Sequence, residues 1–160
     1  MELDLCDFQS IRNFATGIRE KYGSIDVLLN NAGIMLAPYE ITKDGFEIQM
    51  CTNHLGHFAL TALLKELIIL NPGSRIVNVS SMAHKQGKMD FDNLFYRTRR
   101  GYSSMKAYCR SKLANLLFTY ELQRRFEAKD IKVISVAAHP GVSQTNLSRF
   151  VEHKLFFKIL

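Results

Sequence analysis

Short runs of valine, isoleucine and leucine alternate with longer amphipathic stretches along this chain, and this alternation most constrains its fold. The runs that read as strands cover residues 25–29, 75–79 and 131–138, with a short strand remnant at residues 3–5. Apolar strands separated by helices are typical of a parallel sheet that helices cover on both faces. We therefore expect an α/β fold with a doubly wound parallel sheet.

The predicted helices cover residues 8–22, 44–70 and 103–126. Asp7 reads as the N-cap of the first helix, and Ser103 with Ser104 reads as the N-cap of the third. The stretch 80–101 has no helical or strand periodicity, so we interpret it as an exposed loop. Together these elements fit one domain, residues 1–160, of a short parallel α/β type.

Cysteine usage and hydropathy limit the compartment and the kind of site. The chain has 160 residues, of which 47% are hydrophobic, which suffices for one core-forming domain. Cys6, Cys51 and Cys109 have no Cys-x-x-Cys spacing and no metal-binding spacing with the histidines, so we expect neither a disulfide scaffold nor a metal site. Lys65 and Glu66 interrupt the longest apolar stretch, and the N-terminus has no signal-like core. These features favour a cytoplasmic location.

The net charge is +6, but the basic residues are scattered along the chain and form no stripe with aromatic residues between them. A nucleic-acid partner is therefore not expected. The one local cluster of basic residues, 97–100, lies in the predicted loop. The amphipathic run 150–160 fits a helix that packs near a substrate, and the same pattern also fits a helix on a membrane surface.

Tyr108 and Lys112 lie four positions apart in the helix predicted at 103–126, so they share one helical face. A nearby ammonium favours the phenolate and lowers a tyrosine pKa from about 10 toward neutrality. Such a phenol can give or take a proton at a reacting oxygen. The spacing alone also fits a half-buried tyrosine beside a solvated lysine.

Tyr102 and Lys106 repeat this spacing six positions earlier. Because the N-cap at Ser103 leaves Tyr102 outside the helix, the pair Tyr108 and Lys112 is the better candidate.

Small or polar residues follow three successive predicted strands. The segments are Asn30-Asn31-Ala32-Gly33, Ser80-Ser81, and residues 139–145, which begin His139-Pro140-Gly141. Each alone is typical of a turn or cap. Ligands bind beyond the carboxyl ends of the strands in open parallel sheets, so all three together indicate a binding site there.

With these motifs the chain resembles the short-chain dehydrogenase/reductase superfamily. The motifs that carry the resemblance are Asn30-Asn31-Ala32-Gly33, Asn53-x-x-Gly56, Val77-Asn78-Val79-Ser80-Ser81, Tyr108-x-x-Ser111-Lys112, and Pro140-Gly141 followed by Thr145. The phrases Ser111-Lys112-Leu113-Ala114-Asn115 and His139-Pro140-Gly141 are most similar to the retinol-dehydrogenase and protochlorophyllide-reductase-like branch.

The resemblance implies a catalytic role for four residues. Tyr108 would be the acid/base, and Lys112 would lower its pKa and bind the nicotinamide ribose. Ser81 would hydrogen-bond the substrate oxygen, with Ser80 as the alternative, and Asn53 would position a water in a proton relay.

The resemblance also implies a dinucleotide cofactor, NADP or NAD, with NADP favoured by the branch. Asp4 and Leu5 would meet the adenine, and the adenosine ribose and the nicotinamide end would contact Asn31, Ala32, Gly33, Tyr108, Lys112, Pro140, Gly141, Ser143 and Thr145. The implied reaction interconverts a small apolar carbonyl and its alcohol, and a homodimer is the implied assembly.

One departure from the family is the absence of its glycine-rich turn, which holds the pyrophosphate at a helix N-terminus. The resemblance therefore implies a domain without its first βαβ unit and with a shortened C-terminus. Either the sequence is part of an active oxidoreductase, or it is a truncated, inactive relative that acts at most through dimerisation. In both cases we expect an unpaired edge at strand 25–29, poor folding of the chain alone and no binding of the cofactor by it.

Overall fold

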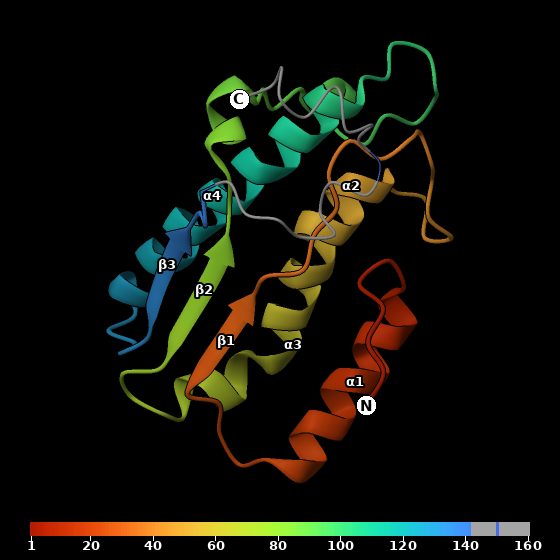
Figure 1. The fold of residues 1–160 in the computed structure, drawn as a ribbon. Coiled ribbons are helices and arrows are strands. Elements are labelled where there is room, and N and C mark those ends of the chain that lie inside the picture. The colour runs from red at the N-terminus through yellow and green to blue at the C-terminus, as the bar shows by residue number, and fades with distance from the viewer. Residues whose placement is uncertain (142–149, 151–160) are drawn as a thin grey trace.

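The structure, a computed structural model, describes residues 1–141 and 150 (Figure 1). Its helices are α1 (Phe8–Lys21), α2 (Ile48–Met50), α3 (Gly56–Ile69) and α4 (Ser104–Ala128), and its strands are β1 (Val27–Asn30), β2 (Arg75–Val79) and β3 (Ile134–Ala138). The three strands form a parallel sheet in the order β1-β2-β3, with Leu29 beside Val77 and Val77 beside Val136. The predicted α/β fold with a parallel sheet is confirmed as a partial Rossmann-like fold.

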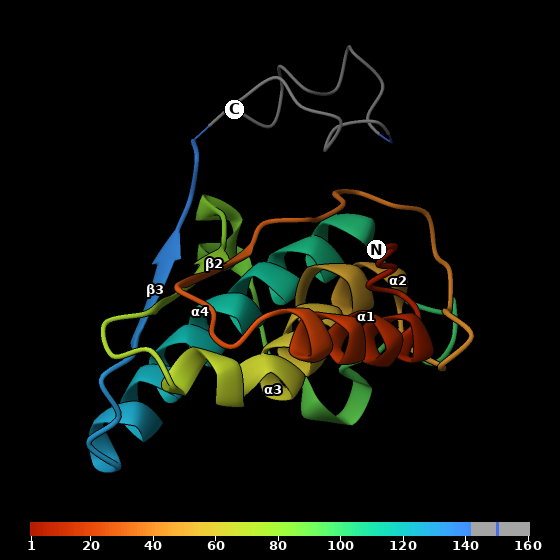
Figure 2. The same ribbon diagram turned by 90° about the horizontal axis from the view of Figure 1, so that it is seen from below.

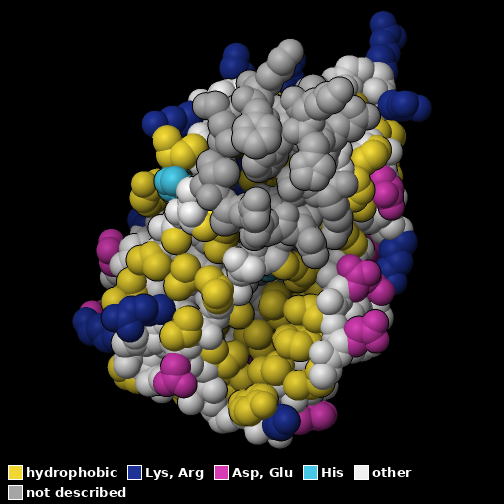
Figure 3. Space-filling model, viewed as in Figure 1, with side chains coloured by type: hydrophobic (Ala, Val, Ile, Leu, Met, Phe, Trp, Pro, Cys, Tyr) yellow, Lys and Arg dark blue, Asp and Glu magenta, His cyan; other side chains and the backbone are white. Residues whose placement is uncertain are grey.

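In the described residues, α1, α3 and α4 all lie on one side of the sheet (Figure 2). The strands alternate accordingly: Ile76 is fully buried toward the helices, whereas Val27 is 56% and Leu29 57% exposed on the opposite face. Figure 3 shows hydrophobic side chains gathered on this face, over the strands and toward α1. The described residues therefore supply the helices of one face of the predicted doubly wound sheet. Its apolar strands still have the composition of a sheet that is covered twice.

The core lies between the sheet and the helices. Ile11 of α1, Leu64 and Ile68 of α3, Ile76 of β2 and Phe126 of α4 pack together there and are almost wholly buried. Truncating one of the aliphatic members to alanine costs about 2–5 kcal/mol in a typical core. The core thus fixes α3 and α4 against β2, and α4 carries both Tyr108 and Lys112.

The predicted strand at residues 3–5 does not form. Leu5 is buried and in a turn, and its backbone lies so close to α3 that a Cβ on Gly56 would come within 2.5 Å of the Leu5 carbonyl oxygen. A strand needs a hydrogen-bonded neighbour, and none of β1, β2 and β3 pairs with this segment. The segment is held instead by α3 and by a hydrogen bond from the Asp4 amide to Ser10 Oγ at 3.0 Å.

The predicted helix 44–70 starts later and is interrupted. Residues 42–46 form a turn in which Gly45 has a φ of +85°, and Glu47 caps α2 by accepting hydrogen bonds from the amides of Gln49 and Met50. A π-helical turn, Cys51–Leu55, then separates α2 from α3. Hydrophobic spacing does not reveal such a turn, because the apolar face continues across it.

The other predictions hold closely. Asp7 caps α1, Ser103 caps α4, and β2 has the predicted bounds. β1 and β3 each start two or three residues later than predicted. The expected loop contains two 3-10 helices, Met82–Gln86 and Phe91–Asn93, and its basic cluster is exposed.

No helix within the described part of the chain is long and apolar enough to cross a membrane. The amphipathic run predicted at 150–160 lies outside the described residues, apart from residue 150.

Candidate active site

Helix α4 presents Tyr108, Ser111 and Lys112 to the interior. Their exposed fractions are 4%, 0% and 3%. The Ser103 hydroxyl accepts a hydrogen bond from the Lys106 amide and so caps the helix, which begins four residues before Tyr108. The spacing of four residues therefore does place the phenol and the ammonium on one buried face.

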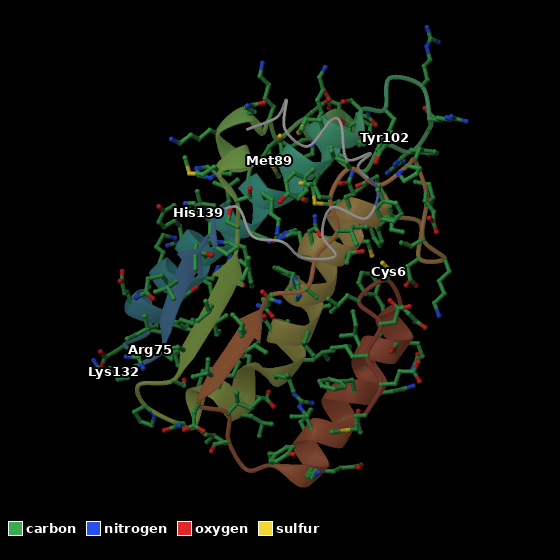
Figure 4. The ribbon with its side chains drawn as sticks, in the orientation of Figure 1. Cys6, Arg75, Met89, Tyr102, Lys132 and His139 are labelled. Atoms are coloured by element: carbon green, nitrogen blue, oxygen red, sulfur yellow. The ribbon has the colours of Figure 1, made fainter. Side chains whose placement is uncertain are left out.

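The hydroxyl of Tyr102, the alternative candidate, makes hydrogen bonds that stabilise the fold. It lies 2.9 Å from the Ala37 carbonyl oxygen and 3.0 Å from Glu47 Oε1, and it accepts a hydrogen bond from Gln49 Nε2 at 2.9 Å. Burial, followed by the charge of Glu47, raises the pKa of Tyr102. Tyr102, which is labelled in Figure 4, thus joins the loop after β1 to α2.

Lys112 is a buried cation with a defined partner. Its Nζ donates a hydrogen bond to the Val79 carbonyl oxygen at 3.0 Å and lies 5.8 Å from the centre of the Tyr108 ring. Burial lowers the pKa of Lys112 to about 8, because the interior disfavours the charged form. The ammonium can therefore lose its proton close to physiological pH.

The Tyr108 pKa differs from the expectation. Burial raises it, and a hydrogen bond with the Ser81 side chain partly offsets that effect. The predicted lowering of this pKa by Lys112 is therefore not observed. Desolvation of the phenol is the larger effect here.

The two serines after β2 have different partners. Ser80 Oγ donates to the Lys112 carbonyl oxygen at 2.8 Å, which ties the strand end to α4. Ser81 begins the 3-10 helix that follows and its side chain meets Tyr108. Of the two, Ser81 is the one that lies beside the phenol.

Asn53 links three parts of the site from the π-helical turn. Its Oδ1 accepts from the Ile34 amide at 2.8 Å, and its Nδ2 donates to the Ile34 carbonyl and to Ser111 Oγ, both at 2.9 Å. The Asn53 carbonyl oxygen lies 3.1 Å from Nδ1 of His57. The Asn53 side chain therefore holds the loop after β1 against α4.

Gly33 brings that loop close to the lysine. A Cβ built on Gly33 would lie 3.0 Å from Asn53 Oδ1 and 3.6 Å from Lys112 Nζ. A glycine here leaves the backbone open to a close approach. The structure thus brings Gly33, Asn53, Ser81, Tyr108 and Lys112 together.

The remaining predicted residues lie nearer the surface or outside the description. Asp4, Asn31, Ala32, Pro140 and Gly141 are exposed, and Leu5 is buried against α3. His139 lies at the carboxyl end of β3 (Figure 4). Ser143 and Thr145 lie outside the described residues.

Sequence reasoning missed Asn115 and His54. Asn115 Nδ2 donates to the Val79 carbonyl oxygen at 3.1 Å, the same oxygen that binds Lys112, and Asn115 Oδ1 lies 3.1 Å from Nδ1 of His54. The available signal was the position of Asn115 three residues after Lys112, which places it on the same helical face.

The fold and this arrangement define a parallel α/β protein with a buried tyrosine, lysine and serine at the carboxyl end of its sheet. A sequence model of the short chain dehydrogenase family matches residues 1–93. Retinol dehydrogenase 13 from Homo sapiens is 50% identical over 147 residues, which cover 92% of this chain and 44% of the relative. Retinol dehydrogenase 11 from Homo sapiens is 48% identical over 157 residues, which cover 98% of this chain and 47% of the relative.

Two solved structures are also similar. An uncharacterized protein from Mycobacterium Paratuberculosis superposes with a TM-score of 0.80 at 53% identity, over 93% of this chain and 52% of that one. A blue fluorescent protein from a metagenomic library, in complex with NADPH, superposes with a TM-score of 0.67 at 28% identity, over 91% of this chain and 53% of that one. The chain belongs to the short-chain dehydrogenase/reductase family, in its retinol-dehydrogenase-like branch, and spans about half the length of these relatives.

Proposed function

We propose that these residues form the catalytic half of an NAD(P)-dependent oxidoreductase that interconverts a carbonyl and an alcohol. The observation that carries the proposal is the meeting of Ser81, Tyr108 and Lys112 where β2 ends against α4. Membership of the short-chain dehydrogenase/reductase family supports the same reaction class.

Each residue has a separate role in the proposed reaction. Tyr108, whose raised pKa keeps it protonated at neutral pH, donates a proton to the carbonyl oxygen during reduction. Ser81 hydrogen-bonds the same oxygen, and Lys112 stabilises the phenolate that forms. A bound nicotinamide supplies or accepts the hydride.

Asn53 has a positioning role in this scheme. Its side chain is bonded to Ile34 and Ser111, so the water that it is proposed to hold would bind at its carbonyl oxygen, which also lies 3.1 Å from Nδ1 of His57.

The residues present fit one end of a dinucleotide. The buried cation of Lys112 beside the bare backbone of Gly33 suits the nicotinamide ribose. The pyrophosphate end has no counterpart, because no two of the nine glycines in these 160 residues are close enough to make the family's glycine-rich turn. Asp4 and Leu5 are proposed for the adenine end, and residues 140–145 for the nicotinamide end.

The proposed substrate is a small apolar carbonyl compound or alcohol, and NADP is the favoured cofactor. Relatives named retinol dehydrogenases and the NADPH complex of the similar blue fluorescent protein support this choice. A homodimer is also proposed, since Phe58 of α3 and Leu117 and Tyr120 of α4 are exposed. A cytoplasmic location remains a proposal that rests on cysteine usage.

The test compares the chain with a fusion that carries the first βαβ unit of retinol dehydrogenase 13 ahead of Met1, called here the completed fusion. We expect the completed fusion to oxidise NADPH when given an apolar aldehyde such as retinal. The chain alone should show no saturable NADPH binding in calorimetry, because each lost charge-assisted bond to pyrophosphate is worth roughly 1.5–3 kcal/mol.

A completed fusion that is folded and binds NADPH but reduces no carbonyl compound would contradict the proposal. It would favour the second candidate, an inactive relative that acts through dimerisation. The exposed apolar residues of β1, α3 and α4 support that candidate, and sedimentation of the chain alone measures it.

A further inference from the structure

The thiols of Cys6 and Cys51 lie together although the two residues are far apart in the sequence. Cys6 lies in the segment before α1, on the side of α2 (Figure 4), and Cys51 begins the π-helical turn. Residues 5 and 6 lie against residues 51 and 52, because Cys6 Sγ lies 2.8 Å from Oγ1 of Thr52, the residue after Cys51, and Cys51 Sγ contacts Leu5, the residue before Cys6. Cys6 is partly exposed, whereas Cys51 is 0% exposed and its Sγ lies 3.8 Å from the Leu5 carbonyl oxygen.

The surroundings of Cys6 favour its thiolate. Its Sγ lies 2.8 Å from Thr52 Oγ1, which also lies 2.8 Å from the Ile48 carbonyl oxygen. The contact with Cys51 lowers the pKa of Cys6 to about 7, and burial opposes this change. The same thiol contact, followed by burial, raises the pKa of Cys51. One thiol is therefore accessible and acidic, and its neighbour is protonated and sheltered.

We propose that Cys6 and Cys51 form a peroxide-sensitive thiol pair that closes to an intramolecular disulfide. The Cys6 thiolate attacks one peroxide oxygen, the O–O bond breaks, and the hydroxide that leaves takes a proton to become water. Cys51 Sγ then attacks the Cys6 sulfenic acid, an S–S bond forms, the S–O bond breaks, and the Cys51 proton leaves with the hydroxide as a second water. Two thiols are oxidised by two electrons in total, and one peroxide is reduced to two waters.

The two cysteines lie close to the candidate active site, so a disulfide between them would affect that site whether or not the proposed reaction takes place there. The disulfide would join the Leu5 segment to the π-helical turn, two residues before Asn53. Asn53 holds Ile34 and Ser111, so the cross-link would restrain the point where the loop after β1 is held against α4.

The test is peptide mapping by mass spectrometry of the whole chain after treatment with one equivalent of hydrogen peroxide. We expect a monomer lighter by about 2 Da, the mass of the two hydrogens lost when a disulfide forms. One cross-linked peptide pair should contain Cys6 and Cys51, and Cys109 should remain a free thiol. Cys109, which is 2% exposed and whose pKa burial raises, is the matched internal control.

Two further measurements keep the proposal testable if a variant unfolds. Iodoacetamide should alkylate Cys6 of the reduced wild-type chain at pH 7 at least about threefold faster than Cys109, because about half of Cys6 is thiolate there. In denaturing urea this preference should disappear. In Cys51→Ser, peroxide should leave a sulfenic acid at Cys6 that dimedone traps.

Three results would overturn the proposal. These are a disulfide that includes Cys109, disulfides formed only between molecules, and alkylation of Cys6 no faster than that of Cys109 in the folded chain.

Discussion

The ammonium of Lys112 donates a hydrogen bond to the carbonyl oxygen of Val79, the last residue of β2, at 3.0 Å. The adjacent Ser80 returns a bond from its hydroxyl to the Lys112 carbonyl oxygen at 2.8 Å. The strand end and the helix are thus joined in both directions at the proposed catalytic lysine. Burial disfavours the charged form of Lys112 and therefore lowers its pKa to about 8.

Lys112→Met should stabilise the completed fusion at pH 7. The folded-state pKa of about 8 lies below the ordinary lysine value of 10.5, so the penalty is fully present below pH 8 and is lost as pH rises to 10.5. We expect a gain of about 1–3 kcal/mol in the free energy of unfolding at pH 7. The Val79 carbonyl keeps Asn115 as a donor. Urea denaturation at pH 7 and pH 10 measures the change.

The control is Lys106→Met, on the exposed side of the same helix, which should change the stability little at either pH. A difference between wild type and Lys112→Met that stays constant from pH 7 to pH 10 would show that the Lys112 ammonium is not desolvated.

Tyr102→Phe should weaken the fold and spare the chemistry. Glu47, Gln49 and the Ala37 carbonyl would lose a buried partner, which costs roughly 1–3 kcal/mol of stability. The kcat of the completed fusion, measured below its unfolding transition, should stay within about twofold of wild type, a change of only ~0.4 kcal/mol. A kcat loss as large as that expected for a catalytic tyrosine would assign the reaction to Tyr102.

Substitution of Ser80 should mainly affect stability, whereas substitution of Ser81 should mainly affect kcat. Ser80→Ala removes the bond to the Lys112 carbonyl and should lower the free energy of unfolding by about 1 kcal/mol, with a modest effect on kcat. Ser81→Ala should lower kcat by about tenfold to a hundredfold, because the substrate oxygen and Tyr108 lose a hydrogen-bond partner. Steady-state kinetics of both variants decide between them, and the reverse order would make Ser80 the catalytic serine.

Gly33→Ala should weaken cofactor binding. The added Cβ would lie 3.0 Å from Asn53 Oδ1 and 3.6 Å from Lys112 Nζ, so side chains at the proposed ribose contact must move. Overpacking of this kind costs about 1–3 kcal/mol, and a loss of about 1.4 kcal/mol weakens the affinity for NADPH tenfold. Calorimetry on the completed fusion measures it. Gly23→Ala is the control, since its Cβ would meet no atom within 4 Å, and equal affinities in the two variants would remove Gly33 from the site.

The sequence predicted the elements that local signals determine. Asp7 and Ser103 cap α1 and α4 as expected, and β2 has the predicted bounds because its apolar run ends in polar residues on both sides. The strand expected at residues 3–5 failed because strand formation depends on a neighbour that local sequence does not reveal. The π-helical turn at Cys51–Leu55 was invisible for a similar reason, since side-chain spacing does not report which carbonyl a given amide bonds.

In the candidate site, too, features that depend on local sequence were predicted and features that depend on tertiary packing were not. The helical spacing predicted that Tyr108 and Lys112 share a face, and they do. The direction of the Tyr108 pKa was wrong, because burial depends on the packing of β2 and α4 around the phenol. The contact between Cys6 and Cys51 was hidden, as it requires the segment before α1 to lie against the π-helical turn.

The most direct test of the account is the kcat of Tyr108→Phe, measured together with its dissociation constant for NADPH in the completed fusion. The account predicts a loss of kcat of about 10²–10⁴-fold, because the proton donor is removed, with the NADPH dissociation constant within about threefold of wild type. Turnover near the wild-type rate in a folded Tyr108→Phe variant that binds NADPH would contradict the assignment of Tyr108 as the acid/base.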